Sequence, residues 1–189
     1  MTTKEHASVK PIRLAMIRDD MEHVPFSPCP PDYALRTYRL GDERRWAAIE
    51  VSAGEFPDQD RALQRFDTEF APFPGDMESR CFILADSRGN AIGTATAWRG
   101  HFAGEERGRV HWVGIVPAYQ GRGLSRPLLG TVMARLAQDH GTAYLTTRTT
   151  NYRAINLYLS FGFAPYLMHE QDEEEGWTMV EQLLHRTIF

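Results

Sequence analysis

The stretch VGIVPAYQGRGLSRPLL, residues 113–129, decides how the chain is interpreted. An apolar run typical of a strand stops at Pro117, and Gln-Gly-Arg-Gly follows at 120–123. A new apolar pattern with a period of 3.6 residues then begins and predicts a helix. We therefore expect a glycine-rich loop at the point where a strand gives way to a helix.

Such a loop is suited to hold a phosphate. The start of a helix exposes backbone N–H groups and the positive end of the helix dipole. Gly121 and Gly123 let an anion approach these donors closely, because they carry no side chain. Arg122 adds a positive charge, and Ser125 adds a hydroxyl at the predicted N-cap. The residues themselves thus predict a phosphate or pyrophosphate cradle.

Two well-known phosphate loops do not match. A P-loop requires Gly-x-x-x-x-Gly-Lys-Ser/Thr, and the lysine is missing. A dinucleotide-binding fingerprint requires Gly-x-Gly-x-x-Gly at the start of a βαβ unit, but Arg126 stands at the third glycine position. The motif also follows several predicted strands instead of opening the domain.

The loop resembles the pyrophosphate loop of the GNAT acyltransferases, Gln/Arg-x-x-Gly-x-Gly/Ala. Gln120, Arg122 and Gly123 fit it, with Ser125 in place of the last small residue. Residues 151–163, NYRAINLYLSFGF, also resemble the family segment Asn-x-x-Ala-x-x-Leu-Tyr-x-x-x-Gly-Phe at every specified position. One predicted helix and one predicted strand separate the two motifs, as in the family, and the resemblance runs from about residue 33 to residue 166.

The resemblance implies a mixed α+β (α/β) fold. Its central sheet would have about six or seven strands, with helices on both faces. The sheet would split in a V between the fourth strand, which ends at Val116, and the fifth strand, residues 143–149. Acetyl-CoA, the implied cosubstrate, would lie in that split.

The resemblance also implies roles for individual residues. The backbone of Ile115 and Val116 would pair with the pantetheine arm, and Asn151 would bind a pantetheine amide. Tyr158 would sit beside the thioester sulfur as the acid, although a tyrosine between two leucines is otherwise typical of a core. The backbone amides expected to hold the pyrophosphate are those of Gln120, Gly121, Arg122, Gly123, Leu124 and Ser125.

The general base is less well defined by the sequence. His111 lies four residues before Ile115 on the same predicted strand, and a pKa near 6.5 suits a base at neutral pH. The alternative is that His111 packs in the core or against a neighbouring strand. Glu105 and Glu106 are further candidates, with exposed surface as their simpler interpretation.

The predicted reaction is direct transfer of an acetyl group to a primary amine in a ternary complex. An ammonium group of pKa about 10.4 must first lose a proton, which costs roughly 4.6 kcal/mol at pH 7. Two alternatives remain: a non-catalytic acyl-CoA-binding module on the same fold, and a nucleotide-binding protein of another class. The acceptor is a small-molecule or peptide amine, with Glu55 and Asp58 as residues that would attract it.

Composition limits the other classes. The 189 residues carry a net charge of −4, which argues against a protein that coats nucleic acid. Two distant cysteines indicate a reducing compartment, and no His or Cys spacing suggests a metal site. No apolar run approaches about 18 residues, and the N-terminus lacks the apolar core of a signal peptide. We expect a cytoplasmic protein without membrane, metal or nucleic-acid partners, and the resemblance favours a homodimer.

The expected organisation is an N-terminal arm with a proline-rich connector, residues 1–30, followed by a GNAT domain, residues 31–189. Within the arm, residues 12–20 are interpreted as a short strand or as part of the arm. Strands are expected at residues 33–40, 80–86, 91–98, 108–116, 142–150 and 163–169. The second and third of these flank a polar Gly/Asn turn and are expected to form a hairpin.

Helices are expected at 41–56, 57–71, 125–141, 152–161 and 172–186. The second has Leu63, Phe66 and Phe70 on one face, and PFPG at 72–75 is expected to end it. Gly141 is expected to end one helix in a left-handed conformation, and Asp172 with Glu175 to form a capping box. The acidic run 170–175 is interpreted as a solvated helix start, with attraction of a cationic substrate as the alternative.

Overall fold

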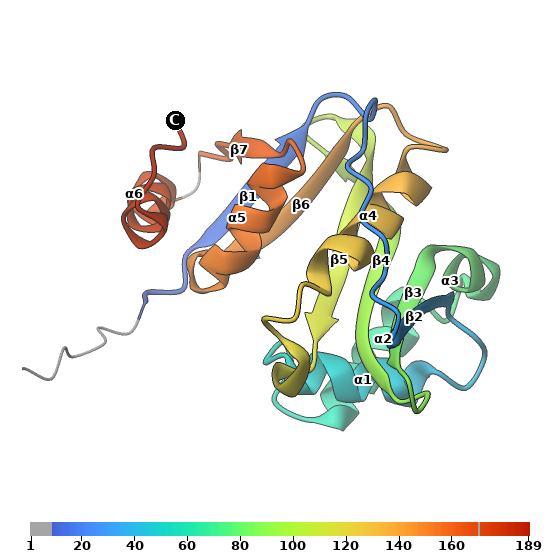
Figure 1. The fold of residues 1–189 in the computed structure, drawn as a ribbon. Coiled ribbons are helices and arrows are strands. Elements are labelled where there is room, and N and C mark those ends of the chain that lie inside the picture. Colours follow the sequence, from blue (N-terminus) through green and yellow to red (C-terminus); the bar gives the residue numbers. More distant parts are fainter. Residues whose placement is uncertain (1–8, 170) are drawn as a thin grey trace, which may run out of the picture. The chain divides into compact units, whose positions relative to one another are not determined.

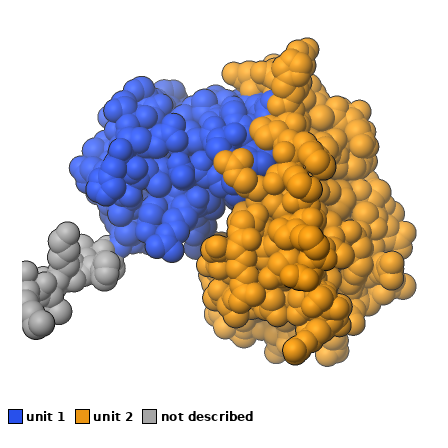
Figure 2. Space-filling model, viewed as in Figure 1, with its two compact units in different colours: residues 1–18, 144–189 blue, residues 19–143 orange. Residues whose placement is uncertain are grey.

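A computed structural model describes residues 9–169 and 171–189, and the chain divides into two compact units (Figure 2). Unit 1 comprises residues 1–18 and 144–189, and unit 2 comprises residues 19–143. The strands are β1 Arg13–Arg18, β2 Tyr33–Thr37, β3 Cys81–Asp86, β4 Ala91–Phe102, β5 Glu105–Ile115, β6 Ala143–Arg148 and β7 Ala164–Tyr166. The helices are α1 Glu43–Ser52, α2 Gln59–Glu69, α3 Pro74–Arg80, α4 Ser125–Leu136, α5 Tyr152–Ser160 and α6 Glu173–Leu184, with 3₁₀ turns η1 Pro117–Tyr119 and η2 Thr149–Asn151.

Unit 2 is built on the antiparallel strands β2, β3, β4 and β5, in that order (Figure 1). The predicted hairpin of β3 and β4 is confirmed. The Asp86 carboxylate accepts hydrogen bonds from the amides of Arg88 and Asn90, at 3.0 and 2.9 Å. Gly89 takes a φ of +81°, which a residue without a side chain adopts without strain.

Helices cover both faces of this sheet. The face of β5 that carries Gly114 meets Ile49 and Glu50 of α1. Gly108 lies on the other face, against Leu136 of α4. The predicted glycine-rich loop therefore leads from β5 into a helix that returns across the sheet.

An aromatic core joins α1 and α2 to the sheet. Trp46 is fully buried, and its ring lies 5.3 Å from Phe66, 5.8 Å from Phe70 and 5.7 Å from Trp112 between centroids. Burial of such rings removes large apolar areas from water and dominates the local stability. The predicted apolar face of α2 accounts for both phenylalanines.

Unit 1 contains β6, β1 and β7, in that order, with α5 and α6. β1 pairs with β7 in antiparallel orientation, and Leu14, Ala15 and Met16 are fully buried. β1 falls within residues 12–20, for which the sequence leaves a short strand or an arm open, and it is a buried strand on which α6 packs. Residues 1–8 of the expected arm lie outside the described residues, and the boundary after residue 30 stays a prediction.

The fold class is confirmed: the described residues form a mixed α/β structure with seven strands. The predicted split would fall between β5 and β6. β5 belongs to unit 2, and residues 144–148 of β6 belong to unit 1, so the split stays a prediction. Within the described part of the chain, no helix combines the length and apolar content that crossing a membrane requires.

Several predicted helix ends are wrong. α4 ends at Leu136, and Gly141 does not adopt a positive φ. Ser125 is the first helical residue, and Leu124 takes the cap position. Asp172 precedes α6 but makes no capping hydrogen bond, because its carboxylate and that of Glu175 both bind Lys10 at 3.0 Å.

α3 is a helix that the sequence analysis did not predict. The segment PFPG was interpreted as the end of the preceding helix, but Pro74 opens α3. Proline is well tolerated in a first helical turn, because its missing N–H would have no partner there.

Candidate functional site

The loop that leads from β5 into α4 presents an open backbone surface. Gly121 and Gly123 take φ values of +75° and +76°, and a Cβ at either position would have no atom within 4 Å. Leu124 is buried and offers no side-chain cap to the helix. The first amides of a helix have no partner within the helix, so this loop has the features of an anion-binding cradle.

Arg122 is held beside the cradle by its neighbours. Its guanidinium donates to the carbonyl oxygen of Ala118 at 2.9 Å and to the hydroxyl of Tyr33 at 3.3 Å. It also lies over the ring of Tyr119, 4.9 Å from the centroid. A cation ordered in this way contributes positive potential at the loop without losing much side-chain freedom on binding.

The end of β5 offers different backbone groups at Ile115 and Val116. The amide of Val116 donates to the carbonyl of Ile92 at 2.9 Å, within the pairing of β5 with β4. The carbonyl of Ile115 accepts the side-chain amide of Gln120, also at 2.9 Å. Because strand residues alternate in the direction of their hydrogen bonds, the backbone groups of Ile115 face away from β4.

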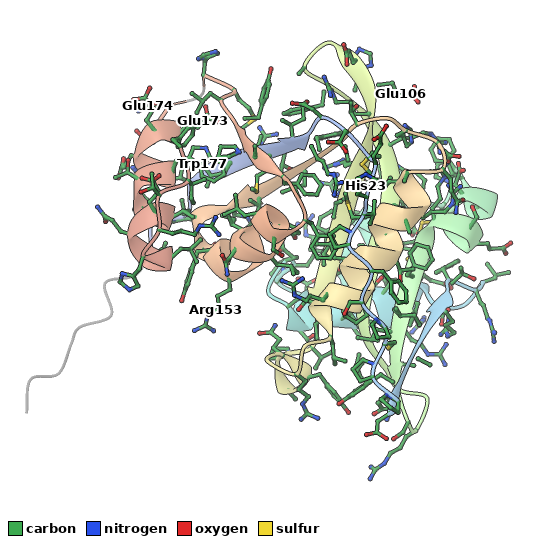
Figure 3. All side chains as sticks on the ribbon, turned by 45° about the horizontal axis from the view of Figure 1, so that its top comes forward. His23, Glu106, Arg153, Glu173, Glu174 and Trp177 are labelled. Atoms are coloured by element: carbon green, nitrogen blue, oxygen red, sulfur yellow. The ribbon has the colours of Figure 1, made fainter. Side chains whose placement is uncertain are left out.

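Asn151 and Tyr158 belong to unit 1, whereas residues 115–125 belong to unit 2. Asn151 ends η2 and occupies the N-cap position of α5, but its side chain makes no capping hydrogen bond. Tyr158 lies on α5 with 7% of its surface exposed, and its ring is 6.2 Å from that of Phe163. Arg153 on the same helix is exposed and points outward (Figure 3).

His111 is buried and paired with a residue that the sequence analysis did not single out. Its Nε2 lies 2.5 Å from Oε1 of Glu69 on α2, and the indole Nε1 of Trp112 donates to Oε2 of the same carboxylate at 3.0 Å. Burial lowers the pKa of His111 to about 4 against the opposing effect of Glu69, so the ring is neutral at pH 7. A neutral ring that donates through Nε2 leaves only Nδ1 as an acceptor.

The charge of Glu69 is stabilised by this cluster. Burial alone would raise the pKa of its carboxyl group. The hydrogen bonds from His111 and Trp112 and the positive charge of Arg109, 3.7 Å away, hold that pKa below its ordinary value. The other candidate bases, Glu105 and Glu106, are exposed at the beginning of β5, and Figure 3 labels Glu106.

Glu50 on α1 is a second carboxyl group missed from the sequence. It is fully buried, and neither of its side-chain oxygens has a hydrogen-bond partner. Oε1 would lie 3.0 Å from a Cβ at Gly114, so this glycine makes room for the carboxyl group. Burial raises the pKa of Glu50 well above its ordinary value, and the charge of Glu55 raises it further.

Asp58 has a structural role at the start of α2. Its carboxylate caps the helix by accepting from the amide of Arg61 at 2.8 Å, and its attraction of an amine stays a prediction, as does that of Glu55. An N-cap of this kind satisfies a free helix amide.

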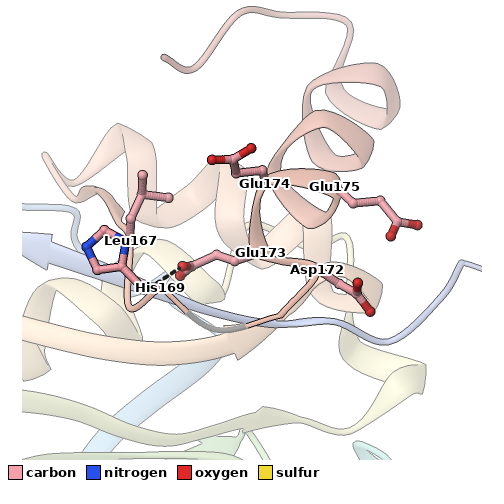
Figure 4. Close-up of a pocket in the computed structure, with 6 residues that line it drawn as sticks. All are labelled: Leu167, His169, Asp172, Glu173, Glu174 and Glu175. Atoms are coloured by element: carbon pink, nitrogen blue, oxygen red, sulfur yellow. Dashed lines mark hydrogen bonds between the residues drawn. The ribbon is translucent and has the colours of Figure 1, made fainter.

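The acidic run lines a hollow of about 410 Å³ in unit 1 (Figure 4). Glu173 holds this segment together, because its carboxylate accepts from the amides of Met168 and His169 at 3.0 Å. Glu174 is exposed, whereas Trp177 on the next turn of α6 is buried (Figure 3). These contacts agree with a helix start that organises the chain; Glu170 of the run lies outside the described residues.

Metal binding has no candidate site in residues 9–169 and 171–189. No group of three or more His, Cys, Asp or Glu side chains in this part of the chain is arranged to hold an ion.

Known proteins resemble the chain over most of its length. Residues 32–163 match the model of the acetyltransferase (GNAT) family. A mycothiol acetyltransferase of Streptomyces bingchenggensis is 30% identical over 145 residues, which are 76% of this chain and 46% of that protein. An N-alpha-acetyltransferase RimI of Mycobacterium tuberculosis is 39% identical over 82 residues, 43% of this chain and 51% of that protein. The chain spans about half the length of the curated relatives it matches.

A solved structure has the same fold. The GCN5-related N-acetyltransferase from Sphaerobacter thermophilus superposes with a TM-score of 0.63 at 21% identity, covering 83% of this chain and 50% of that one.

Proposed function

We propose, because the chain belongs to the GNAT acetyltransferase family, that it transfers an acetyl group from acetyl-CoA to a primary amine. The observation that carries the proposal is the cradle of residues 120–125 at the start of α4. Its two left-handed glycines leave the space beside the backbone amides open to an anion. The pyrophosphate of acetyl-CoA is an anion of suitable size and charge.

The residues of the cradle suit their proposed roles. The amides of residues 121–125 bind the pyrophosphate, and Arg122 adds positive charge beside it. The amide of Gln120 already donates to the carbonyl of Pro117 at 3.2 Å. The pantetheine arm pairs with the backbone groups of Ile115 that face away from β4, and this requires Gln120 to release the Ile115 carbonyl or to stay as a side-chain bridge. Asn151, whose side chain does not cap α5, is available to bind a pantetheine amide.

The reaction needs no covalent enzyme intermediate. The neutral amine attacks the carbonyl carbon of the thioester, the C–S bond breaks, and the departing thiolate takes a proton from Tyr158. The attacking nitrogen releases its extra proton to water, and water returns a proton to Tyr158. The thiolate has a pKa of about 8.5, so the acid contributes less than the removal of the ammonium proton does.

The base role of His111 stays a proposal, and its contacts argue against it. The ring is buried, its Nε2 is bound to Glu69, and its pKa of about 4 makes it a weak acceptor for an ammonium proton. These contacts favour a role for His111 in holding β5.

The names of two relatives suggest which class of amine to propose as the acceptor. One relative is named for mycothiol and another for N-alpha-amines, so a small-molecule amine and a peptide N-terminus are the two acceptors to test. Both carry an amine that is protonated at neutral pH to a large extent.

The cradle is tested by calorimetric titration of acetyl-CoA into wild type and Gly123→Ala. A Cβ at φ +76° is strained by about 1–2 kcal/mol and moves the loop amides. We expect acetyl-CoA to bind at least tenfold more weakly, a loss of about 1.4 kcal/mol. Gly104→Ala is the matched control: its φ is +83°, it has equal open space, and it stands at the opposite end of β5.

The outcomes separate clearly. Tight binding by wild type and Gly104→Ala, with weak binding by Gly123→Ala, supports the cradle. Equal affinity of all three proteins would reject the cradle. Absence of acetyl-CoA binding by wild type, with tight binding of ATP or NAD, would replace the proposal by a nucleotide-binding function.

A further inference from the structure

Two consecutive residues of β5 reach the same carboxylate. The ring nitrogens of His111 and Trp112 both bind Glu69, at 2.5 and 3.0 Å. In a regular strand, neighbouring side chains point to opposite faces of the sheet and cannot share one partner. The strand must therefore be irregular at this point.

The irregularity is a β-bulge. On β4, Thr94 pairs with Gly114 and Thr96 pairs with His111, so two steps on β4 correspond to three on β5. Trp112 has a φ of +47°, a conformation that bulky side chains rarely adopt. A bulge of this kind inserts one residue and changes the face to which all later residues point.

The bulge exchanges the faces of the residues beyond it. Gly108 lies against α4 and Gly114 against α1, although positions six residues apart in a regular strand share a face. The His111 side chain and the position that a Cβ would take at Gly114 consequently lie on the same face, whereas alternation would separate them.

The backbone changes in the same way. Beyond the bulge, the Val116 amide binds Ile92 of β4, and the Ile115 carbonyl is left to Gln120. Without the extra residue, the backbone groups of Ile115 would face β4 and those of Val116 would face away from it, because hydrogen-bonding direction alternates along a strand. The bulge thus decides which backbone groups are offered to a ligand at the end of β5.

Glu69 is well placed to maintain this strained conformation. Its side chain is 19% exposed. Glu69 stands at the end of α2 and connects this helix to His111 and Trp112, the two residues at the bulge in β5. Hydrogen bonds to an ionised, half-buried carboxylate are stronger than those between neutral groups.

We propose that Glu69 is a positioning residue whose carboxylate clamps His111 and Trp112, maintains the bulge, and selects Ile115 as the residue whose backbone faces the acyl-CoA. The link to acyl-CoA rests on the proposed function, whereas the clamp itself rests on the geometry of unit 2.

The first measurement is amide hydrogen exchange of Glu69→Ala, Glu69→Gln and the control Asp67→Ala, an exposed carboxylate on the same helix. Loss of the bulge removes the Val116 amide from Ile92, so we expect its exchange to accelerate at least tenfold in Glu69→Ala. The amide of Gly108, which donates to Thr142 at 3.1 Å on the other side of the bulge, keeps its rate. Glu69→Gln is intermediate, because one amide oxygen replaces two acceptors.

The second measurement is the dissociation constant of acetyl-CoA for the same proteins. We expect at least tenfold weaker binding by Glu69→Ala and unchanged binding by Asp67→Ala. Urea unfolding of the same proteins distinguishes positioning from general loss of stability, because a positioning effect persists under conditions in which Glu69→Ala and wild type are both fully folded.

The clamp is overturned if the Val116 amide of Glu69→Ala exchanges as slowly as in wild type. It is also overturned if the exchange of the Gly108 amide accelerates by the same factor as that of Val116. Unchanged acetyl-CoA affinity of Glu69→Ala would overturn the link to the ligand. If wild type does not bind acetyl-CoA, the proposed function fails, and the exchange rates of Val116 and Gly108 still decide the clamp.

Discussion

Glu50 shows how one side chain can make stability depend on pH. A buried carboxyl group without partners is stable only in its neutral form, which is why its pKa is raised. The folded protein then holds a proton that the unfolded chain releases near pH 4.3. The stabilisation is complete below that pH and is lost as pH rises toward the raised pKa of the folded state.

We therefore predict that Glu50→Gln flattens this dependence. Glutamine cannot ionise. The free energy of unfolding of the variant minus that of wild type should therefore increase between pH 5 and pH 8, because only wild type loses stability as the pH rises. A gain of about 1.4 kcal/mol or more corresponds to one pKa unit. Urea titrations at both pH values measure it, with the exposed Glu78→Gln as control. An equal difference at both pH values would contradict a raised pKa.

The sequence held a signal for both missed glutamates. Glu50 follows the buried Trp46 by one helical turn, and Glu69 lies beside Phe66 and Phe70 on α2. A carboxylate on the apolar face of a helix is unusual, because burial of an unpaired charge is costly. The helical period could have identified these two positions, but not their partners on β5, which depend on the bulge.

At the scale of elements, the contact of α6 with β1 yields a prediction about stability. A Cβ at Gly176 would lie 2.9 Å from Cγ2 of Ile12 and 3.1 Å from Cδ2 of Leu14. We expect Gly176→Ala to lose about 1–3 kcal/mol through overpacking, despite the higher helix propensity of alanine. Thermal unfolding measures the loss.

Gly75→Ala on α3 serves as the control for helix propensity. A Cβ there meets no atom within 4 Å, so alanine should leave stability unchanged or raise it by up to about 1 kcal/mol. A stable Gly176→Ala variant would mean that α6 does not pack closely on β1.

The elements also mark what the sequence could and could not predict. Long periodic segments such as α2, α4 and the β3–β4 hairpin were predicted from local patterns, because those patterns already contain the buried face. For β1 the sequence left a strand and an arm open, because the burial of β1 depends on α6 and β7, which are more than 140 residues away. The predicted capping box of α6 is wrong because both carboxylates, those of Asp172 and Glu175, bind Lys10 instead.

For the whole molecule, the decisive question is whether it catalyses transfer or only binds acyl-CoA. Most candidate residues came from two short motifs, which indicate where a cosubstrate binds. Catalysis depends on groups whose roles the sequence could give only by resemblance. Tyr158 is the residue at which the two functions differ, because a binding module has no need of an acid.

We predict that Tyr158→Phe lowers kcat while leaving the dissociation constant of acetyl-CoA within about twofold of wild type. The reduction should be about 10²-fold, the lower end for general acid catalysis, since the thiolate is a good leaving group. Tyr152→Phe, on the same helix, is the matched control and should transfer at the wild-type rate.

Transfer rates are measured by thiol release with a small amine and with a peptide N-terminus. A Tyr158→Phe protein as fast as wild type would remove the acid role, and a wild type that binds acetyl-CoA but acetylates neither acceptor would favour the binding module, because the cradle acts without the chemistry.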